Sequence, residues 1–309
     1  MLNTVMNEQK LASETNENVQ QSSTKGYRFP PLINYLREIY NKKLKEETSA
    51  KTGLPNLDVI LENGYSPGLH VIAGMPNIGK RSLLIHMTEE FTKQKFAVIM
   101  ISSKESKTSI VQRFIARTTY KNDPANAIRL NQVPNQLSSD PLKYKQLLNQ
   151  VVPTIKFISL TETPMLDMYS LEDKILQQKE AYSQSVILID LHEFSSWNKD
   201  ESLLNEKIDT IRQIAVKLQI PILLTFDLNP NDVQNLLKGY STSEGIERHV
   251  TTFSFLHTAI PPQHEQTPKN QSTTSQNELL RLQLKNARTG SNHQIYFTHR
   301  IDYGYFQEG

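Results

Sequence analysis

The chain has 309 residues, and its 34 Lys and Arg against 32 Asp and Glu leave a net charge of +2, so no strong global field points to a nucleic-acid or membrane partner. It contains no cysteine, which excludes disulfides, cysteine-ligated zinc, iron–sulfur clusters and a thiol nucleophile. The start lacks the pattern of a secretory signal, and the longest apolar runs fall far short of the ~20 residues of a membrane span. We therefore expect a cytoplasmic protein.

The first fifty residues predict a tail and a linker. Residues 1–26 are rich in Asn, Gln, Ser and Glu, a composition typical of a disordered segment. Residues 27–50 are expected to form a linker helix that starts near Pro30 and either packs on its own domain or docks on a neighbouring subunit. A single domain is expected over residues 51–309.

Short apolar strands alternate with helical stretches beyond residue 52, which is typical of a doubly wound parallel sheet with helices on both faces. The expected strands are 69–73, 96–102, 154–160, 186–190, 222–226 and 251–256. The expected helices are 82–94, 108–118, 170–182 and 203–218.

The C-terminal part has a different pattern. Residues 279–284 and 294–298 alternate between apolar and polar, and with residues 303–306 they predict an antiparallel extension of the sheet. Residues 261–277 are rich in Gln, Thr, Ser and Pro and predict a mobile loop.

The uneven distribution of glycine points to a phosphate loop. Five of the eleven glycines lie between Gly53 and Gly79. A strand, then G-x-x-x-x-G-K from Gly74 to Lys80, then a helix predict a loop whose N–H groups and helix N-terminus face phosphates. An ordinary glycine turn into a helix is the alternative. The expected nucleotide-binding residues are Gly74, Asn77, Gly79, Lys80, Arg81 and Ser82.

The metal-binding part of this loop is altered. A Ser or Thr normally follows the lysine, because its hydroxyl binds Mg²⁺, but Arg81 stands here. Ser82 lies about 100° further round the helix, so we do not expect it to substitute. Asp190 ends an apolar strand and is the expected indirect ligand of any Mg²⁺.

The order of several segments resembles a known family. Thr52–Asp58, Pro67–Leu69 and Gly74–Lys80 are similar to the RecA-like C-terminal domain of DnaB-type replicative DNA helicases, and Lys285–Gly290 resembles that family's late K-x-R-x-G segment with one extra residue. The likeness covers about residues 30–309 and does not include the family's N-terminal helical domain.

The resemblance implies a RecA-like P-loop NTPase fold assembled into a hexameric ring, with ATP between subunits. In such a ring Lys285 and Arg288 of a neighbour touch the γ-phosphate, and loops such as 195–202 and 228–241 track single-stranded DNA. Other replication proteins are further partners that the resemblance implies.

Four positions depart from the family pattern, and one of them is Ser241, which stands where the family has an arginine. Lys104 stands where the family has its catalytic glutamate, Asp227 replaces a sensor glutamine, and Arg81 replaces the metal-binding hydroxyl. Since NTP hydrolysis depends on positioning and charge stabilisation, these losses predict a poor ATPase or none. Either Arg81 and Lys104 replace the charge of Mg²⁺ and ATP or ADP binds without turnover, or Asp227 pairs with one of them and closes the site.

Three functional interpretations follow. The first is a helicase-derived replication protein of a mobile element or phage, acting as an assembly, loading or regulatory subunit. The second is an active ATP-dependent helicase with displaced catalytic residues, for which Glu105 or Glu193 is recruited. The third is a plain nucleotide- or DNA-binding module without a ring.

Overall fold

A computed structural model describes residues 49–102, 106–162, 171–173, 175–177, 182, 184–190, 201–242, 245–259, 277–286 and 291–309. The predicted tail, nearly all of the predicted linker and residues 261–276 of the predicted mobile loop lie outside this part. No helix in the described ranges is long and apolar enough to cross a membrane.

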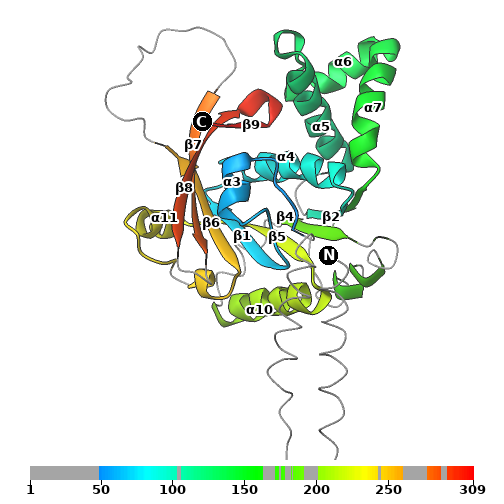
Figure 1. The fold of residues 1–309 in the computed structure, drawn as a ribbon. Helices are drawn as coiled ribbons and strands as arrows, with labels where there is room; N and C mark the ends of the chain where they lie inside the picture. Colours follow the sequence, from blue (N-terminus) through cyan, green and yellow to red (C-terminus); the bar gives the residue numbers. More distant parts are fainter. Residues whose placement is uncertain are drawn as a thin grey trace, which may run out of the picture. The chain divides into compact units, whose positions relative to one another are not determined.

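A nine-stranded sheet runs through the described part in the order β3-β2-β4-β5-β1-β6-β7-β8-β9 (Figure 1). Strands β1 to β6 pair in parallel, and β7 to β9 add an antiparallel extension. The α/β fold class is therefore confirmed. The strands are β1 (Gly68–Gly74), β2 (Ala97–Ser102), β3 (Ile158–Glu162), β4 (Ser185–Asp190), β5 (Pro221–Asp227), β6 (Thr252–Thr258), β7 (Asn277–Asn286), β8 (Asn292–Arg300) and β9 (Tyr305–Glu308).

Burial differs between the parallel strands and the antiparallel extension. All seven residues of β1 are buried, as expected for a central strand with helices on both sides. Buried and exposed residues alternate along the second half of β8, from Ile295 onwards, because only one of its faces packs on the core. The antiparallel extension thus covers one side of the molecule and leaves its other face open.

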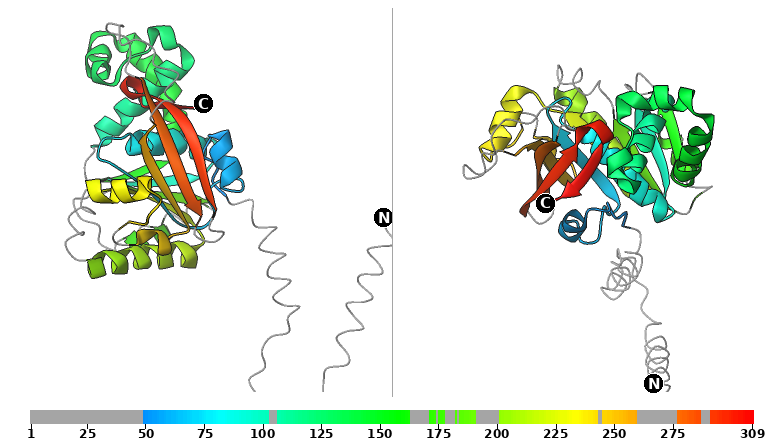
Figure 2. Two further views of the ribbon diagram at one scale, coloured as in Figure 1. Left: turned by 90° about the vertical axis from the view of Figure 1, so that its left-hand side faces the viewer. Right: turned by 90° about the horizontal axis from the view of Figure 1, so that it is seen from above.

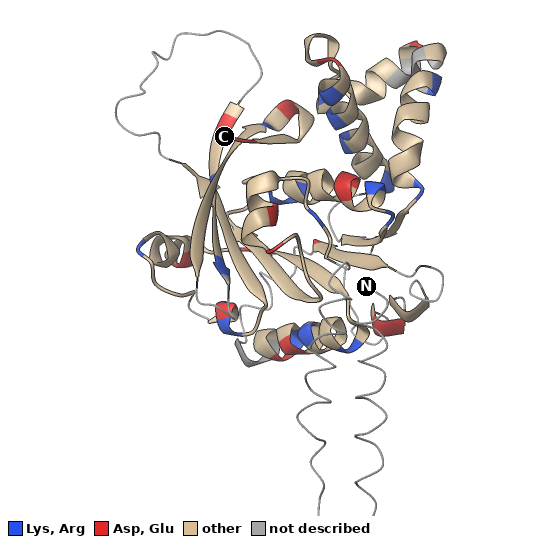
Figure 3. Ribbon diagram, in the orientation of Figure 1, with Lys and Arg blue, Asp and Glu red and all other residues tan. Residues whose placement is uncertain are grey.

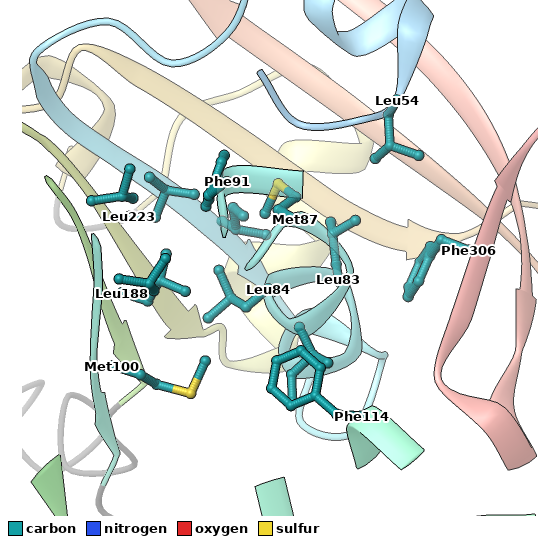
Figure 4. Packing of buried hydrophobic residues seen from close by; sticks show 14 of the residues in the cluster. Leu54, Leu83, Leu84, Met87, Phe91, Met100, Phe114, Leu188, Leu223 and Phe306 are labelled. Carbon is teal, nitrogen blue, oxygen red and sulfur yellow. The ribbon is translucent and has the colours of Figure 1, made fainter. Parts of the chain in front are cut away.

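Helices cover both faces of the parallel strands (Figures 1 and 2). On one face lies α4 (Lys80–Lys93), followed by α5 (Lys107–Asn122). In Figure 4, apolar residues of α4 such as Leu84 and Phe91 lie against Leu188 and Leu223 of the sheet, and burying each such side chain contributes about 1.5–3 kcal/mol.

The opposite face is covered by α10 (Glu201–Leu218). Its buried residues recur at intervals of three and four, so one stripe faces the sheet. These residues are Leu204, Ile208, Ile211, Ile214, Ala215 and Leu218. Figure 3 shows Lys, Arg, Asp and Glu along this helix, while the central strands carry few charges.

Several local predictions were wrong. The strand expected at 154–160 begins only at Ile158, because α7 (Pro141–Ile155) occupies its first residues. The segment 228–241, expected as a loop, contains α11 (Pro230–Leu237). Residues 303–306 do not form one strand: Gly304 adopts a φ of 58° between a short 3₁₀ turn and β9.

Other elements were not predicted. They are α3 (Pro55–Ile60), α6 (Val133–Ser139) and α7, with the 3₁₀ turns η2 (Pro124–Asn126), η3 (Leu130–Gln132), η4 (Ile246–Arg248) and η5 (Ile301–Tyr303). All but α7 are short, so hydrophobic periodicity gives little signal there, whereas α7 buries Leu147 and Val151 four residues apart and could have been recognised. The helix expected at 170–182 is described only in part, and its residues 171–173 and 175–177 are helical.

A buried charge cluster joins α4 to α5. Glu89 of α4 accepts a hydrogen bond from Arg117 at 2.9 Å and another from Lys121. Burial alone would raise the pKa of Glu89, but Arg117 and Lys121 outweigh it and lower the pKa to about 2. The Arg117 guanidinium also lies over the ring of Tyr305 in β9 at 5.0 Å. The cluster therefore ties the helix that follows the phosphate loop to the C-terminal strands.

Candidate functional site

Backbone geometry at the end of β1 matches a phosphate loop. A Cβ at Gly74 would lie 2.5 Å from the carbonyl oxygen of Leu256, so only glycine allows this close approach to β6. Gly79 has a φ of 103°, and a Cβ there would also meet the ring of His299 at 3.0 Å. Asn77 is left-handed at a φ of 63°. Helix α4 begins at Lys80, so its N-terminus borders the loop.

The phosphate-loop lysine is fully engaged within the protein. Lys80 Nζ donates to the carbonyl oxygens of Gly74 at 2.9 Å and Met75 at 2.7 Å, and it pairs with Asp227 Oδ1 at 2.7 Å. An ammonium group has three hydrogens, so these three acceptors satisfy it. The side chains of Lys80 and Asp227 are only 8% and 19% exposed, which makes their attraction stronger than that of a surface pair.

Strand register explains this pairing. Asp227 lies at the end of β5 directly opposite Gly74 of β1, and the N–H of Leu228 donates to the Gly74 carbonyl at 3.0 Å. The carboxylate therefore stands at the mouth of the loop, where Lys80 extends. Lys80 is thus a partner of Asp227 besides the two that the sequence suggests, Arg81 and Lys104.

Arg81 pairs with the carboxylate at the end of β4. Its Nε donates to Asp190 Oδ2, and the hydroxyl of Thr225 donates to Asp190 Oδ1 at 2.7 Å. Both oxygens of Asp190 are thus engaged by groups of the protein itself. A guanidinium stands where phosphate loops place a metal-binding hydroxyl, and it is bonded to the aspartate that such a metal needs. These residues do not fit a Mg²⁺ ion held in the usual way.

A cavity of about 320 Å³ opens at these groups. Its lining contains every described residue that we expected to bind nucleotide except Gly74. The lining residues are Asn77, Gly79, Lys80, Arg81, Ser82, Arg113, Leu130, Asp190, Thr225, Asp227, His299 and Ile301. The loop after β1 thus meets α5, β4, β5 and β8, which are distant in sequence, at one pocket.

Three polar members of this lining were missed from sequence. Thr225 lies two residues before Asp227 in the same strand, so both side chains point to one face, and this spacing was a usable signal. Arg113 in α5 and His299 in β8 gave no local signal. Burial and the positive charge of Arg113 lower the pKa of His299 to about 4, so this imidazole is neutral at pH 7.

Other predicted site residues lie elsewhere. Lys285 is exposed near the end of β7 and lines a second cavity of about 390 Å³, together with residues after α11 such as Lys238 and Tyr240. Lys104, Arg288 and most of the 195–202 loop lie outside the described residues. Within the described ranges, no group of three or more His, Asp or Glu is placed to hold a metal ion.

Comparison with known proteins now decides the family. The model of the DnaB-like helicase C-terminal domain matches residues 49–308. The chain belongs to this family. This DnaB-like domain is 22% identical over 208 residues to a probable replicative DNA helicase of Guillardia theta, a match that covers 65% of this chain and 33% of that protein. The chain thus spans about a third of that relative's length.

Solved structures share the fold. A solved ATPase domain superposes with a TM-score of 0.71 at 15% identity, covering 90% of this chain and 99% of that one. A DnaB-like replicative helicase, described with its interactions with primase, gives 0.68 at 14% identity over 96% of this chain and 71% of that one. The RadB recombinase gives 0.51 at 13% identity, covering 82% and 97%. The RecA-like fold is therefore confirmed.

Proposed function

We propose that this DnaB-like domain is a DNA-replication protein that binds ATP or ADP without Mg²⁺ and hydrolyses ATP poorly or not at all. It acts as an assembly, loading or regulatory subunit of a mobile element or phage. The observation that carries the proposal is the pairing of Lys80 with Asp227 and of Arg81 with Asp190. In a working phosphate loop these positions serve the nucleotide and its metal.

Nucleotide binding is supported by what the loop retains. Asn77 and Gly79 keep the left-handed backbone of such a loop, and the N-terminus of α4 lies at the cavity. Arg81 adds a permanent positive charge beside Asp190, since a guanidinium is never deprotonated in a protein. Part of the charge that a metal would supply therefore comes from the chain itself.

Impaired hydrolysis is supported by what the loop has lost. A metal in such a site would neutralise the charge that develops on the phosphates during transfer. Here Asp190 is bonded to Arg81 and Thr225, and Asp227 brings a carboxylate to the place of a neutral amide. Each group that stabilises the transition state of hydrolysis contributes several kcal/mol. Losing two such groups therefore lowers the rate of ATP hydrolysis by orders of magnitude.

We propose that this domain self-associates into a hexameric ring. Its further proposed partners are single-stranded DNA and other replication proteins. Lys285, Lys238 and Tyr240 gather at the second cavity, and cations beside an aromatic ring suit the backbone and bases of a single strand. Such binding weakens as salt concentration rises.

The test is a titration of the full chain with a fluorescent ADP analogue, in Mg²⁺ and in EDTA. We expect the same Kd in both buffers. Arg81→Ala weakens the EDTA binding by roughly tenfold, the worth of one lost charge contact. The control Arg212→Ala, on α10 across the sheet, leaves it unchanged. A strict Mg²⁺ requirement contradicts metal-free binding. Absence of binding in both buffers contradicts the nucleotide site and favours a plain DNA-binding module.

A further inference from the structure

The acidic side of the phosphate cavity bears on which nucleotide fits. Asp190 and Asp227 end two neighbouring strands, β4 and β5, and both line the cavity. The loop and the start of α4 border the same cavity from the other side. A ligand in this cavity therefore borders both the phosphate loop and two carboxylates.

Two of the three Lys and Arg side chains in the described lining, Lys80 and Arg81, are already bonded to these carboxylates. Lys80 has all three ammonium hydrogens directed at Gly74, Met75 and Asp227. Arg81 is bonded to Asp190. A terminal phosphate that approaches Lys80 must either displace the Asp227 carboxylate, 2.7 Å from its Nζ, or remain beside it.

A second feature of the cavity is a buried histidine in its wall. His299 lines it beside Gly79, is 3% exposed, and has both ring nitrogens buried without a hydrogen-bond partner among the described residues. Its ring stacks on Phe306 with centroids 4.3 Å apart, which holds it in place. An unpaired buried polar group of this kind is costly.

From these contacts we infer that the site selects a nucleoside diphosphate over a triphosphate. The inference rests on the proposed nucleotide binding and specifies its ligand class. A diphosphate ends at the amides of the loop. A triphosphate would carry its γ-phosphate beyond the loop towards Asp190 and Asp227, whose partners Arg81 and Lys80 are already bonded to them. Asp227 thus acts as an internal anion: it is bonded to Lys80, the side chain that would otherwise bind the γ-phosphate.

The test compares ADP with the non-hydrolysable triphosphate AMP-PNP by calorimetry on the full chain in EDTA. We expect ADP to bind tighter by roughly tenfold or more, because like charges within a few ångströms repel by at least that factor. Asp227→Asn and Asp227→Gln release Lys80, so AMP-PNP affinity rises in both and the ratio approaches one. Asp173→Asn, an exposed carboxylate away from the cavity, is the matched control and keeps the wild-type ratio.

The outcomes separate this inference from the proposal on which it rests. Equal or tighter AMP-PNP binding by the wild-type chain overturns diphosphate selection and leaves nucleotide binding intact. Failure of both ligands to bind overturns nucleotide binding itself. The wild-type comparison needs no variant, so it decides the matter even where a variant fails to fold. An unchanged ratio in two folded Asp227 variants removes Asp227 as the cause.

Discussion

Removing Arg117 should destabilise the domain strongly. Its side chain is only 4% exposed, it donates to Glu89 at 2.9 Å, and it lies over the Tyr305 ring. Breaking a buried pair by deleting one partner costs about 3–5 kcal/mol, because a charge is left without its partner. Since Glu89 keeps Lys121, we expect Arg117→Ala to lie at the lower end of that range, at about 3 kcal/mol.

The assay is urea unfolding followed by circular dichroism. The matched control is Lys93→Ala, whose side chain also pairs with Glu89 but is 50% exposed, and for which we expect a loss below about 1 kcal/mol. An Arg117→Ala loss as small as that of the control would refute the reasoning, since burial would then not determine the strength of the pair.

Three further predictions concern pH, packing and metal. Between pH 7 and pH 5 the unfolded chain binds protons at histidines of pKa near 6.5, while His86 and His299 stay neutral in the fold with pKa values of about 3 and about 4. Stability therefore falls as the pH is lowered, by about 2 kcal/mol for each, and His86→Asn should lessen the fall measured by urea unfolding. Gly74→Ala pushes a Cβ into a backbone oxygen of β6, so thermal unfolding should show a loss of more than ~2 kcal/mol. Arg81→Thr restores a metal-binding hydroxyl, so the Kd for nucleotide should become lower in Mg²⁺ than in EDTA.

The phosphate loop could be predicted because its chemistry is local. Gly74, Gly79 and Lys80 have the spacing of a phosphate-loop motif within one short segment. Asp190 is recognisable as the end of an apolar strand. The start of α11 also carried a usable signal: the Asn229 side chain accepts from the N–H of Asp232, and Pro230 occupies the first turn.

The partners within the site could not be predicted, because they depend on strand order. Asp227 meets Lys80 only because β5 lies beside β1, although the two residues are far apart in sequence. Arg81 meets Asp190 only because β4 lies one strand further. The charges of these side chains could be read from the sequence. Which aspartate pairs with Lys80 and which with Arg81 depends on the order of the strands in the folded sheet.

Phosphate release from ATP in the presence of single-stranded DNA tests the central claim most directly. With Lys80 and Arg81 bound to Asp227 and Asp190, we expect the full chain to release phosphate no faster than its Lys80→Ala variant. A DNA-stimulated rate that Lys80→Ala abolishes would contradict the claim and identify an active helicase motor with displaced catalytic residues.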